Sequence, residues 1–163
     1  MGCDIHLMVE VRDKKLDQWK EYDIADELLK NIGRNYNLFS ILANVRNGVG
    51  FANSDTGNAF IPIDNPRGVP NDASEKYIAY VENWGLDGHS HSFLDLAELK
   101  KYDWRGQKNK HRGFMNQKDY AEYKRTGKIT RYATNVSSES VKKIANDCNC
   151  ENEDVRLLFF FDD

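Results

Sequence analysis

The sequence predicts an α+β fold, in which a mixed or antiparallel sheet contains both ends of the chain and several short helices flank it. Residues 2–12 alternate apolar and polar side chains, which is the period of a β-strand. Residues 155–161 form a run that is apolar except for Arg156 and suits a buried central strand. Helical and strand-like patterns are intermixed between them without a βαβ repeat. The length of 163 residues indicates a single domain over residues 1–163.

The first third of the chain predicts two strands and two helices. The strand over 2–12 is followed by a turn and a short returning strand over 18–22. Apolar residues at helical spacing predict one helix that ends at Gly33 and a second helix over 36–45. Residues 46–58 are rich in Gly and Asn, which is typical of a loop.

The rest of the chain continues to mix short elements. A strand is expected over 59–63 and another over 89–94. Two acidic residues, each followed by Glu three positions later, have capping-box spacing and predict helix starts. The pairs are Asp72 with Glu75, for a helix over 73–84, and Asp95 with Glu98, for a helix that ends near Tyr102. Further elements are expected over 117–126 (a helix ended by Gly127), 129–133 (a strand) and 138–147 (a helix).

The net charge of −3 conceals an uneven distribution. Residues 1–99 carry a net −7, residues 100–131 a net +8, and residues 132–163 a net −4. A protein that coats DNA needs a basic face to displace counterions, and the chain as a whole does not supply one. This balance excludes a general DNA coat but not a small anionic ligand. The basic block is a solvated surface or the rim of a ligand site, depending on whether Lys108, Lys110 and Arg112 face residues 89–91.

Targeting to a membrane or to the exterior is not expected. No apolar run approaches the roughly 20 residues that a membrane helix needs, and charged residues interrupt the N-terminus where a signal peptide would lie. An odd cysteine count of three without a secretory signal indicates reduced thiols in a cytoplasm. Cys3 lies on the apolar side of the first strand, so we expect it to pack in the core rather than act as a nucleophile.

Two histidine-containing segments have the residue types of a metal site. Asp4 and His6 are expected on one face of the first strand, about 6.5–7 Å apart. His89 and His91 share a face if they lie in a strand, and would complete four ligands for zinc or manganese. A bound water would then be activated for hydrolysis, with Asp87 or Glu10 as the base. A solvated strand face is the simpler interpretation of these residues. Unless they bind a metal ion, we expect the protein to have no cofactor.

The same region also has the residue types of a ligand-binding site. Hydroxyls, imidazoles and amides near Gly88 can bind a phosphate or a base edge. Three loop arginines have forks that match phosphates, and nearby aromatic rings can stack on bases. The simpler interpretation is that each arginine pairs with an acid. The predicted ligand-binding residues are Arg34, Asn35, Tyr36, Arg46, Asn47, Arg67, Asp87, His89, Ser90, His91 and Ser92.

Four segments resemble a widespread family of small tailed-phage proteins that begin MGCDIH and continue with a DGHSHS segment. They are MGCDIH, RNYNLFSILANVRNG, PRGVP and WGLDGHSHSFLDLAELKKYDW, within residues 1–12 and 34–104. Small nonvirion phage proteins often act early against host functions, and one group blocks cyclic-nucleotide immune signalling by sequestering or cleaving the signal. The resemblance therefore implies a counter-defence role in the host cell cytoplasm.

We expect a binding protein rather than an enzyme. It would sequester a small anionic nucleotide, such as a cyclic oligonucleotide immune signal, in a homo-oligomer, with neither DNA nor a membrane as partner. One alternative is a metal-dependent phosphodiesterase that uses Asp4, His6, His89 and His91. A second alternative is a protein inhibitor of a host enzyme that uses the basic block.

Overall fold

The computed structural model describes residues 2–23, 32–49, 55, 59–104, 117–127 and 150–163. The chain divides into two compact units, one of residues 1–34, 66–102 and 138–163, the other of residues 35–65 and 103–137. The single domain expected from the chain length stays a prediction. The helix predicted before Gly33, the strand over 129–133 and the helix over 138–147 lie outside the described residues, apart from Ile32.

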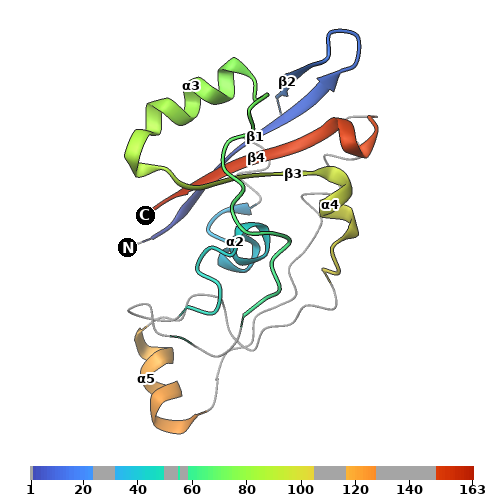
Figure 1. Ribbon diagram of the computed structural model, residues 1–163. Coiled ribbons are helices and arrows are strands. Elements are labelled where there is room, and N and C mark those ends of the chain that lie inside the picture. The colour runs from blue at the N-terminus through green and yellow to red at the C-terminus, as the bar shows by residue number, and fades with distance from the viewer. Residues whose placement is uncertain (1, 24–31, 50–54, 56–58, 105–116, 128–149) are drawn as a thin grey trace. The chain divides into compact units, whose positions relative to one another are not determined.

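The first unit contains a four-stranded antiparallel sheet in the order β2-β1-β4-β3 (Figure 1). Its strands are β1 (Asp4–Asp13), β2 (Gln18–Tyr22), β3 (His89–Asp95) and β4 (Val155–Asp162). Strands β1 and β4 pair from Asp4 with Asp162 to Val11 with Val155. The two ends of the chain therefore lie side by side at one end of the sheet. The α+β fold with both chain ends in the sheet is confirmed.

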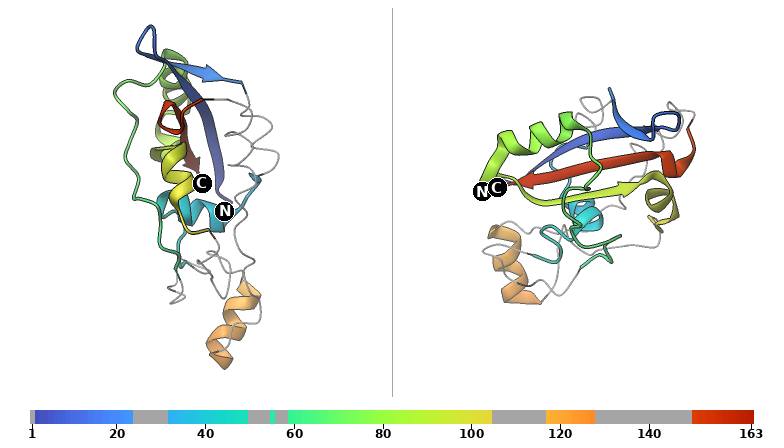
Figure 2. Two further views of the ribbon diagram at one scale, coloured as in Figure 1. Left: turned by 90° about the vertical axis from the view of Figure 1, so that its right-hand side faces the viewer. Right: turned by 45° about the horizontal axis from the view of Figure 1, so that its top comes forward.

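Strand β4 is the buried interior strand that its apolar run predicts. Residues Val155–Phe161 are all buried, and β4 lies between β1 and β3. Figure 2 shows β1, β4 and β3 running side by side. A strand with neighbours on both edges and cover on both faces has no solvated side, so it loses the alternation of polar residues that marks β1.

Helix α3 (Glu75–Trp84) covers one face of this sheet. Tyr77 packs there with Met8, Leu158 and Phe160. The cap of α3 differs from the prediction, because Ser74 accepts the hydrogen bond from the Tyr77 N–H. Asp72 lies outside the helix, and its carboxylate accepts hydrogen bonds from other residues.

A buried ion pair lies under the start of α3. Arg156 donates to Glu10 from Nε at 2.8 Å, its Nη2 lies 2.7 Å from the same carboxylate oxygen, and Glu10 is 0% exposed. The other oxygen of Glu10 accepts from the Ser74 N–H at 2.9 Å. Arg156 also donates to Asp72 at 2.7 Å and lies 4.0 Å from the Trp19 ring centroid. The solvated interpretation of this face of β1 is therefore wrong for Glu10 and for His6, whose side chain is 15% exposed, whereas Asp4 keeps 47% of its side chain exposed.

Helix α4 (Leu96–Lys101) follows β3 directly and starts as predicted. The Asp95 carboxylate accepts from the Glu98 N–H at 2.7 Å, and the Glu98 carboxylate accepts from the Asp95 N–H at 3.0 Å. This reciprocal capping box satisfies two amide groups that the first turn of a helix leaves without partners. Two short 3₁₀ turns precede strands, η2 (Gly85–Asp87) before β3 and η3 (Asn152–Asp154) before β4.

The second unit contains α2 (Tyr36–Ala43) and α5 (Gln117–Thr126), both predicted. The strand predicted over 59–63 is wrong. The Ile63 N–H donates to the Ile41 carbonyl at 2.7 Å, and the Asn47 side chain bonds to both backbone groups of Phe60. These backbone groups are satisfied by a helix and an amide side chain, which leaves them no strand partner.

Candidate functional site at one end of the sheet

Three histidines lie at the end of the sheet where the two chain ends meet. His6 is on β1, and His89 and His91 are on β3. Between them β4 contributes Phe160 and Phe161, two neighbours in sequence that project to opposite faces of the sheet. The face under α3 carries Phe160, and the other face carries Phe161.

A β-bulge separates His89 from His91. His89 pairs with Phe161 and Ser92 pairs with Phe159, so two residues of β3 lie opposite Phe160 alone. Ser90 adopts a φ of 52°, a left-handed conformation that is uncommon for any residue except glycine. The prediction that His89 and His91 share a face is therefore wrong. Strict alternation holds only when no residue is inserted into the ladder.

On the α3 face, the Phe160 ring lies between two imidazoles. The ring centroid of His6 is 4.8 Å from that of Phe160, and the centroid of His91 is 5.0 Å from it. The interplanar angles of 18° and 21° make both contacts stacked. Trp84 from α3 lies 4.0 Å from the His6 centroid. Burial, and then repulsion by His89, lowers the pKa of His91 below its usual value, so His91 is neutral at pH 7.

Polar groups lie near His6, yet Nε2 of His6 and Nε2 of His91 have no hydrogen bonds among the described residues. Nδ1 of His6 lies 3.0 Å from the Tyr80 hydroxyl, and Nε2 lies 3.5 Å from Asp162 Oδ1. Nε2 of both histidines is buried without a hydrogen-bond partner among the described residues. Next to them a Cβ on Gly88 would lie 3.4 Å from Nε2 of His91 and 3.2 Å from the Phe160 ring. The glycine therefore leaves room beside the imidazole.

On the opposite face, His89 lies beside Cys3 and Asp163. One sulfur, nitrogen or carboxylate oxygen from each of these residues lies within 4.8 Å of the others. Nε2 of His89 is 3.8 Å from Asp163 Oδ2, while its Nδ1 is 3.0 Å from the Ser90 hydroxyl. Cys3 is buried, as its place on the apolar side of β1 predicts.

The four predicted metal ligands do not gather in one cluster. The bulge places His89 and His91 on opposite faces, as described above. Asp4 accepts two hydrogen bonds from Arg34, at 2.6 and 2.7 Å. These bonds hold the pKa of Asp4 below its usual value. Among the residues that the structure describes, the donor groups placed together are those of Cys3, His89 and Asp163.

Two of the three predicted arginines pair with acids. Arg34 binds Asp4, and Arg67 binds Glu98 through two hydrogen bonds of 3.0 and 2.5 Å. The simpler interpretation is thus confirmed for these two. Arg46, in the second unit, lies over Tyr36 with 5.7 Å from its guanidinium carbon to the ring centroid. Lys108, Lys110 and Arg112 lie outside the described residues.

Several other predicted ligand-binding residues have structural contacts. The Ser92 hydroxyl accepts from the Arg67 N–H at 3.2 Å, which ties the loop before α3 to β3. Asn35 caps α2 by accepting from the Leu38 N–H, and Asn47 holds Phe60 as described above. Asp87 ends the η2 turn, and Ser90 orients His89.

Residues that the sequence pattern missed complete the candidate site. Tyr80, Phe160 and Asp162 lie around the imidazole of His6. Asp162 and Asp163 directly follow the apolar run of β4, and this abrupt change to two carboxylates is a signal that could have drawn attention to them. Their partners depend on the pairing of β4 with β1 and β3, which local sequence does not reveal.

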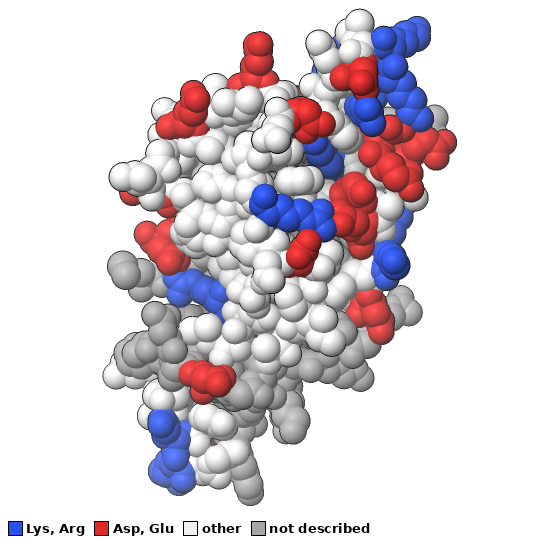
Figure 3. Space-filling view, in the orientation of Figure 1, with Lys and Arg blue, Asp and Glu red and all other residues white. Residues whose placement is uncertain are grey.

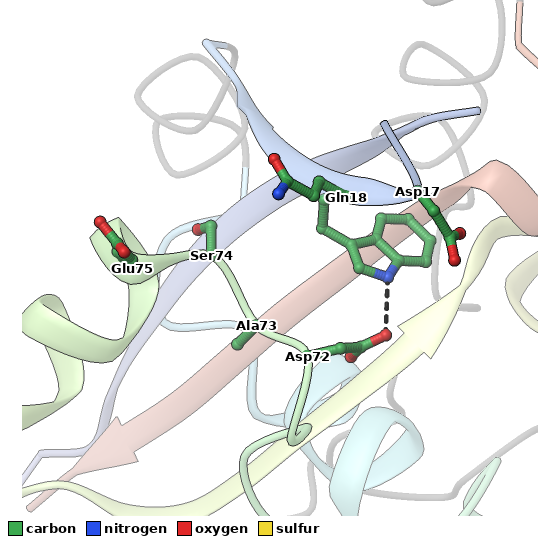
Figure 4. A pocket seen from close by; sticks show the side chains of 7 residues that line it. Asp17, Gln18, Asp72, Ala73, Ser74 and Glu75 are labelled. Atoms are coloured by element: carbon green, nitrogen blue, oxygen red, sulfur yellow. Dashed lines mark hydrogen bonds between the residues drawn. The ribbon is translucent and has the colours of Figure 1, made fainter. Parts of the chain in front are cut away.

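A pocket of about 520 Å³ lies between the start of β2 and the N-terminus of α3 (Figure 4). It is lined in part by Trp19, whose indole N–H donates to Asp72 at 2.9 Å. None of the predicted site residues lines it. The lining residues are Asp17, Gln18, Trp19, Asp72, Ala73, Ser74 and Glu75.

Charged side chains of both signs are mixed on the face shown in Figure 3. They gather around the β1–β2 hairpin, where Arg12 pairs with Asp17, Lys20 with Asp13, and Lys14 with Asp154. Within the described part of the chain, no helix is long and apolar enough to cross a membrane.

The chain matches no protein-family model, no curated protein and no solved structure. The resemblance to a tailed-phage family therefore stays a prediction.

Proposed function

We propose that this protein binds and holds a small anionic nucleotide beside His6 and His91, on the α3 face at the end of the sheet. The observation that carries the proposal is that Nε2 of each histidine is buried without a hydrogen-bond partner among the described residues. A buried polar atom without a partner costs about 1–3 kcal/mol. A ligand that supplies the missing partners recovers this free energy.

The surroundings favour a nucleotide over a bare anion. A nucleotide combines a flat base with polar edges, and the site combines aromatic rings with polar atoms. Asp162, which is partly exposed, offers acceptors for an exocyclic amino group, and an inorganic anion would be repelled by that carboxylate. The neutral imidazole of His91 can donate or accept, depending on its tautomer.

The proposal revises the expected role of the arginines. Arg34 lies at the same end of the sheet, because a Cβ on Gly2 would meet its guanidinium. It is largely exposed and attracts an anion even while paired with Asp4. Arg67 is bound to Glu98 and to the Phe93 carbonyl, so its contribution is to fix the loop beside β3. Action in the host cell cytoplasm and assembly into a homo-oligomer belong to the same proposal.

Calorimetry with a panel of cyclic di- and trinucleotides tests the proposal. We expect heat of binding with at least one member, and a loss of affinity of tenfold or more in His6→Gln and His91→Gln. Lys76→Gln is the matched control, because Lys76 is exposed on the same helix that contributes Tyr80 and Trp84. No heat with any nucleotide contradicts the proposal.

Analysis of the ligand recovered from the protein distinguishes sequestration from hydrolysis. After incubation, chromatography of the released nucleotide shows it intact if the protein only sequesters it. Cleaved product, lost on chelation and restored by added metal, would instead support the phosphodiesterase alternative.

A further inference from the structure

We infer that Cys3, His89 and Asp163 bind a divalent transition-metal ion, with zinc as the best match, on the face of the sheet opposite α3. A thiolate, an imidazole and a carboxylate are the three protein donors that zinc accepts. The thiolate and imidazole select against magnesium and calcium, which prefer oxygen ligands. The inference does not depend on the proposed nucleotide site, because that site uses the other face.

The spacing of the donor atoms suits a tetrahedral ion. Zinc–ligand bonds of about 2.0–2.3 Å place neighbouring donors about 3.4–3.6 Å apart. Nε2 of His89 is already 3.8 Å from Asp163 Oδ2, and all three donors lie within 4.8 Å of one another. A movement of a few tenths of an ångström closes the first of these gaps. Asp163 is 50% exposed, so its side chain has room to make that movement.

The orientation of His89 is fixed by its neighbour. The Ser90 hydroxyl lies 3.0 Å from Nδ1, which leaves Nε2, 3.8 Å from Asp163 Oδ2, as the nitrogen available to an ion. Nε2 is buried and has no hydrogen bond among the described residues. Ligating histidines characteristically use their second nitrogen for such a bond, which sets the tautomer.

The burial of Cys3 favours a role as a metal ligand over a role as a catalytic nucleophile. Cys3 is 0% exposed, so a substrate carbonyl or phosphate cannot reach its sulfur, whereas a bare ion can. The side chain of His89 is 38% exposed and that of Asp163 is 50% exposed, so solvent reaches this side of the cluster. Three protein ligands leave the fourth tetrahedral position to water, as in catalytic rather than structural zinc sites.

Cobalt spectroscopy of a variant that lacks the other two cysteines tests the site. The variant Cys148→Ser/Cys150→Ser leaves Cys3 as the single thiol of the chain. We expect Co²⁺ to produce a thiolate-to-cobalt charge-transfer band at one equivalent, and Zn²⁺ to displace it. Because the band reports sulfur ligation directly, the test does not require a Cys3 variant that folds.

Neighbouring residues supply matched controls in the same background. His89→Gln and Asp163→Asn are expected to weaken cobalt binding by more than about 100-fold, beyond the 10–100-fold loss typical of outer-shell changes. His91→Gln and Asp162→Asn place the same substitutions one or two positions away on the opposite face, and are expected to leave the affinity unchanged. Circular dichroism confirms that each variant is folded.

Two results would overturn the inference. One is the absence of a charge-transfer band when Cys3 is the single thiol and the protein is folded. The other is an equal loss of cobalt affinity in the Asp162→Asn and Asp163→Asn variants, which would show that the charge of the region attracts the ion without a defined ligand set.

Discussion

Replacing Arg156 with methionine tests the buried charge network under α3. The Glu10 carboxylate, which is 0% exposed, accepts hydrogen bonds from Arg156 Nε and from the Ser74 N–H, and a second nitrogen of Arg156 lies 2.7 Å from it in the ion pair. The Arg156 side chain is only 6% exposed. Methionine has a similar unbranched stem and fills much of the space, so the main change is the loss of the charge and its hydrogen bonds.

The expected cost follows from what remains in the variant. Glu10 keeps only the Ser74 N–H as a partner and stays buried, so its charge is uncompensated. Breaking a buried ion pair on one side typically costs about 3–5 kcal/mol of unfolding free energy. At about 2–4 °C per kcal/mol for a chain of this size, the melting temperature is expected to fall by about 6–20 °C.

Urea and thermal unfolding of single and double variants measure the effect. Glu10→Leu/Arg156→Met removes both charges, so it is expected to recover much of the stability that the single variant loses. Lys76→Met breaks the exposed pair with Glu21 and is the control, for which little change is expected because solvent screens such pairs.

Two results would refute this reasoning. If Arg156→Met and Lys76→Met lower stability equally, burial does not determine the cost of losing the pair. If the double variant is less stable than Arg156→Met by the full effect of Glu10→Leu, the two charges do not interact energetically.

Three further predictions concern single side chains near α3. Tyr77→Phe is expected to leave stability unchanged or raise it slightly in thermal unfolding, because the buried Tyr77 hydroxyl has no partner among the described residues; a clear loss contradicts this. Because burial lowers the pKa of His91, stability is expected to decrease as pH falls below about 6.5, and His91→Phe to reduce that slope in urea titrations across pH. Burial pushes the pKa of Asp72 upward, but hydrogen bonds from Arg156 and Trp19 hold it below its usual value. Its stabilisation is therefore complete above about pH 4 and lost as pH falls further, and acid unfolding of Asp72→Asn should lack this component.

Local sequence patterns predicted elements whose cause is local. The alternation of residues 2–12, the apolar run of 155–161 and the Asp95–Glu98 capping box each depend on neighbours in the chain, and all three were confirmed. The strand predicted over 59–63 failed because its backbone groups bond to α2 and to Asn47, partners that lie many residues away.

In the candidate site, too, the sequence predicted the residue types but not the contacts between distant residues. The sequence identified His6, His89 and His91 as residues with the right chemistry, and it placed Cys3 on the buried side of β1. Which of them meet was decided by one extra residue in β3, since the bulge at Ser90 sends His89 and His91 to opposite faces. Periodicity describes a regular strand and therefore cannot locate such an insertion.

The sequence by itself determined the class of fold, the chain ends in one sheet and the residue types of the site, because these follow from periodicity and composition. The tertiary structure alone decided that Arg34 and Arg67 pair with Asp4 and Glu98, and that Cys3 and Asp163 lie beside His89. Such contacts join residues 30 to 160 positions apart. They are fixed by strand pairing and packing, which depend on the whole chain and not on any segment of it.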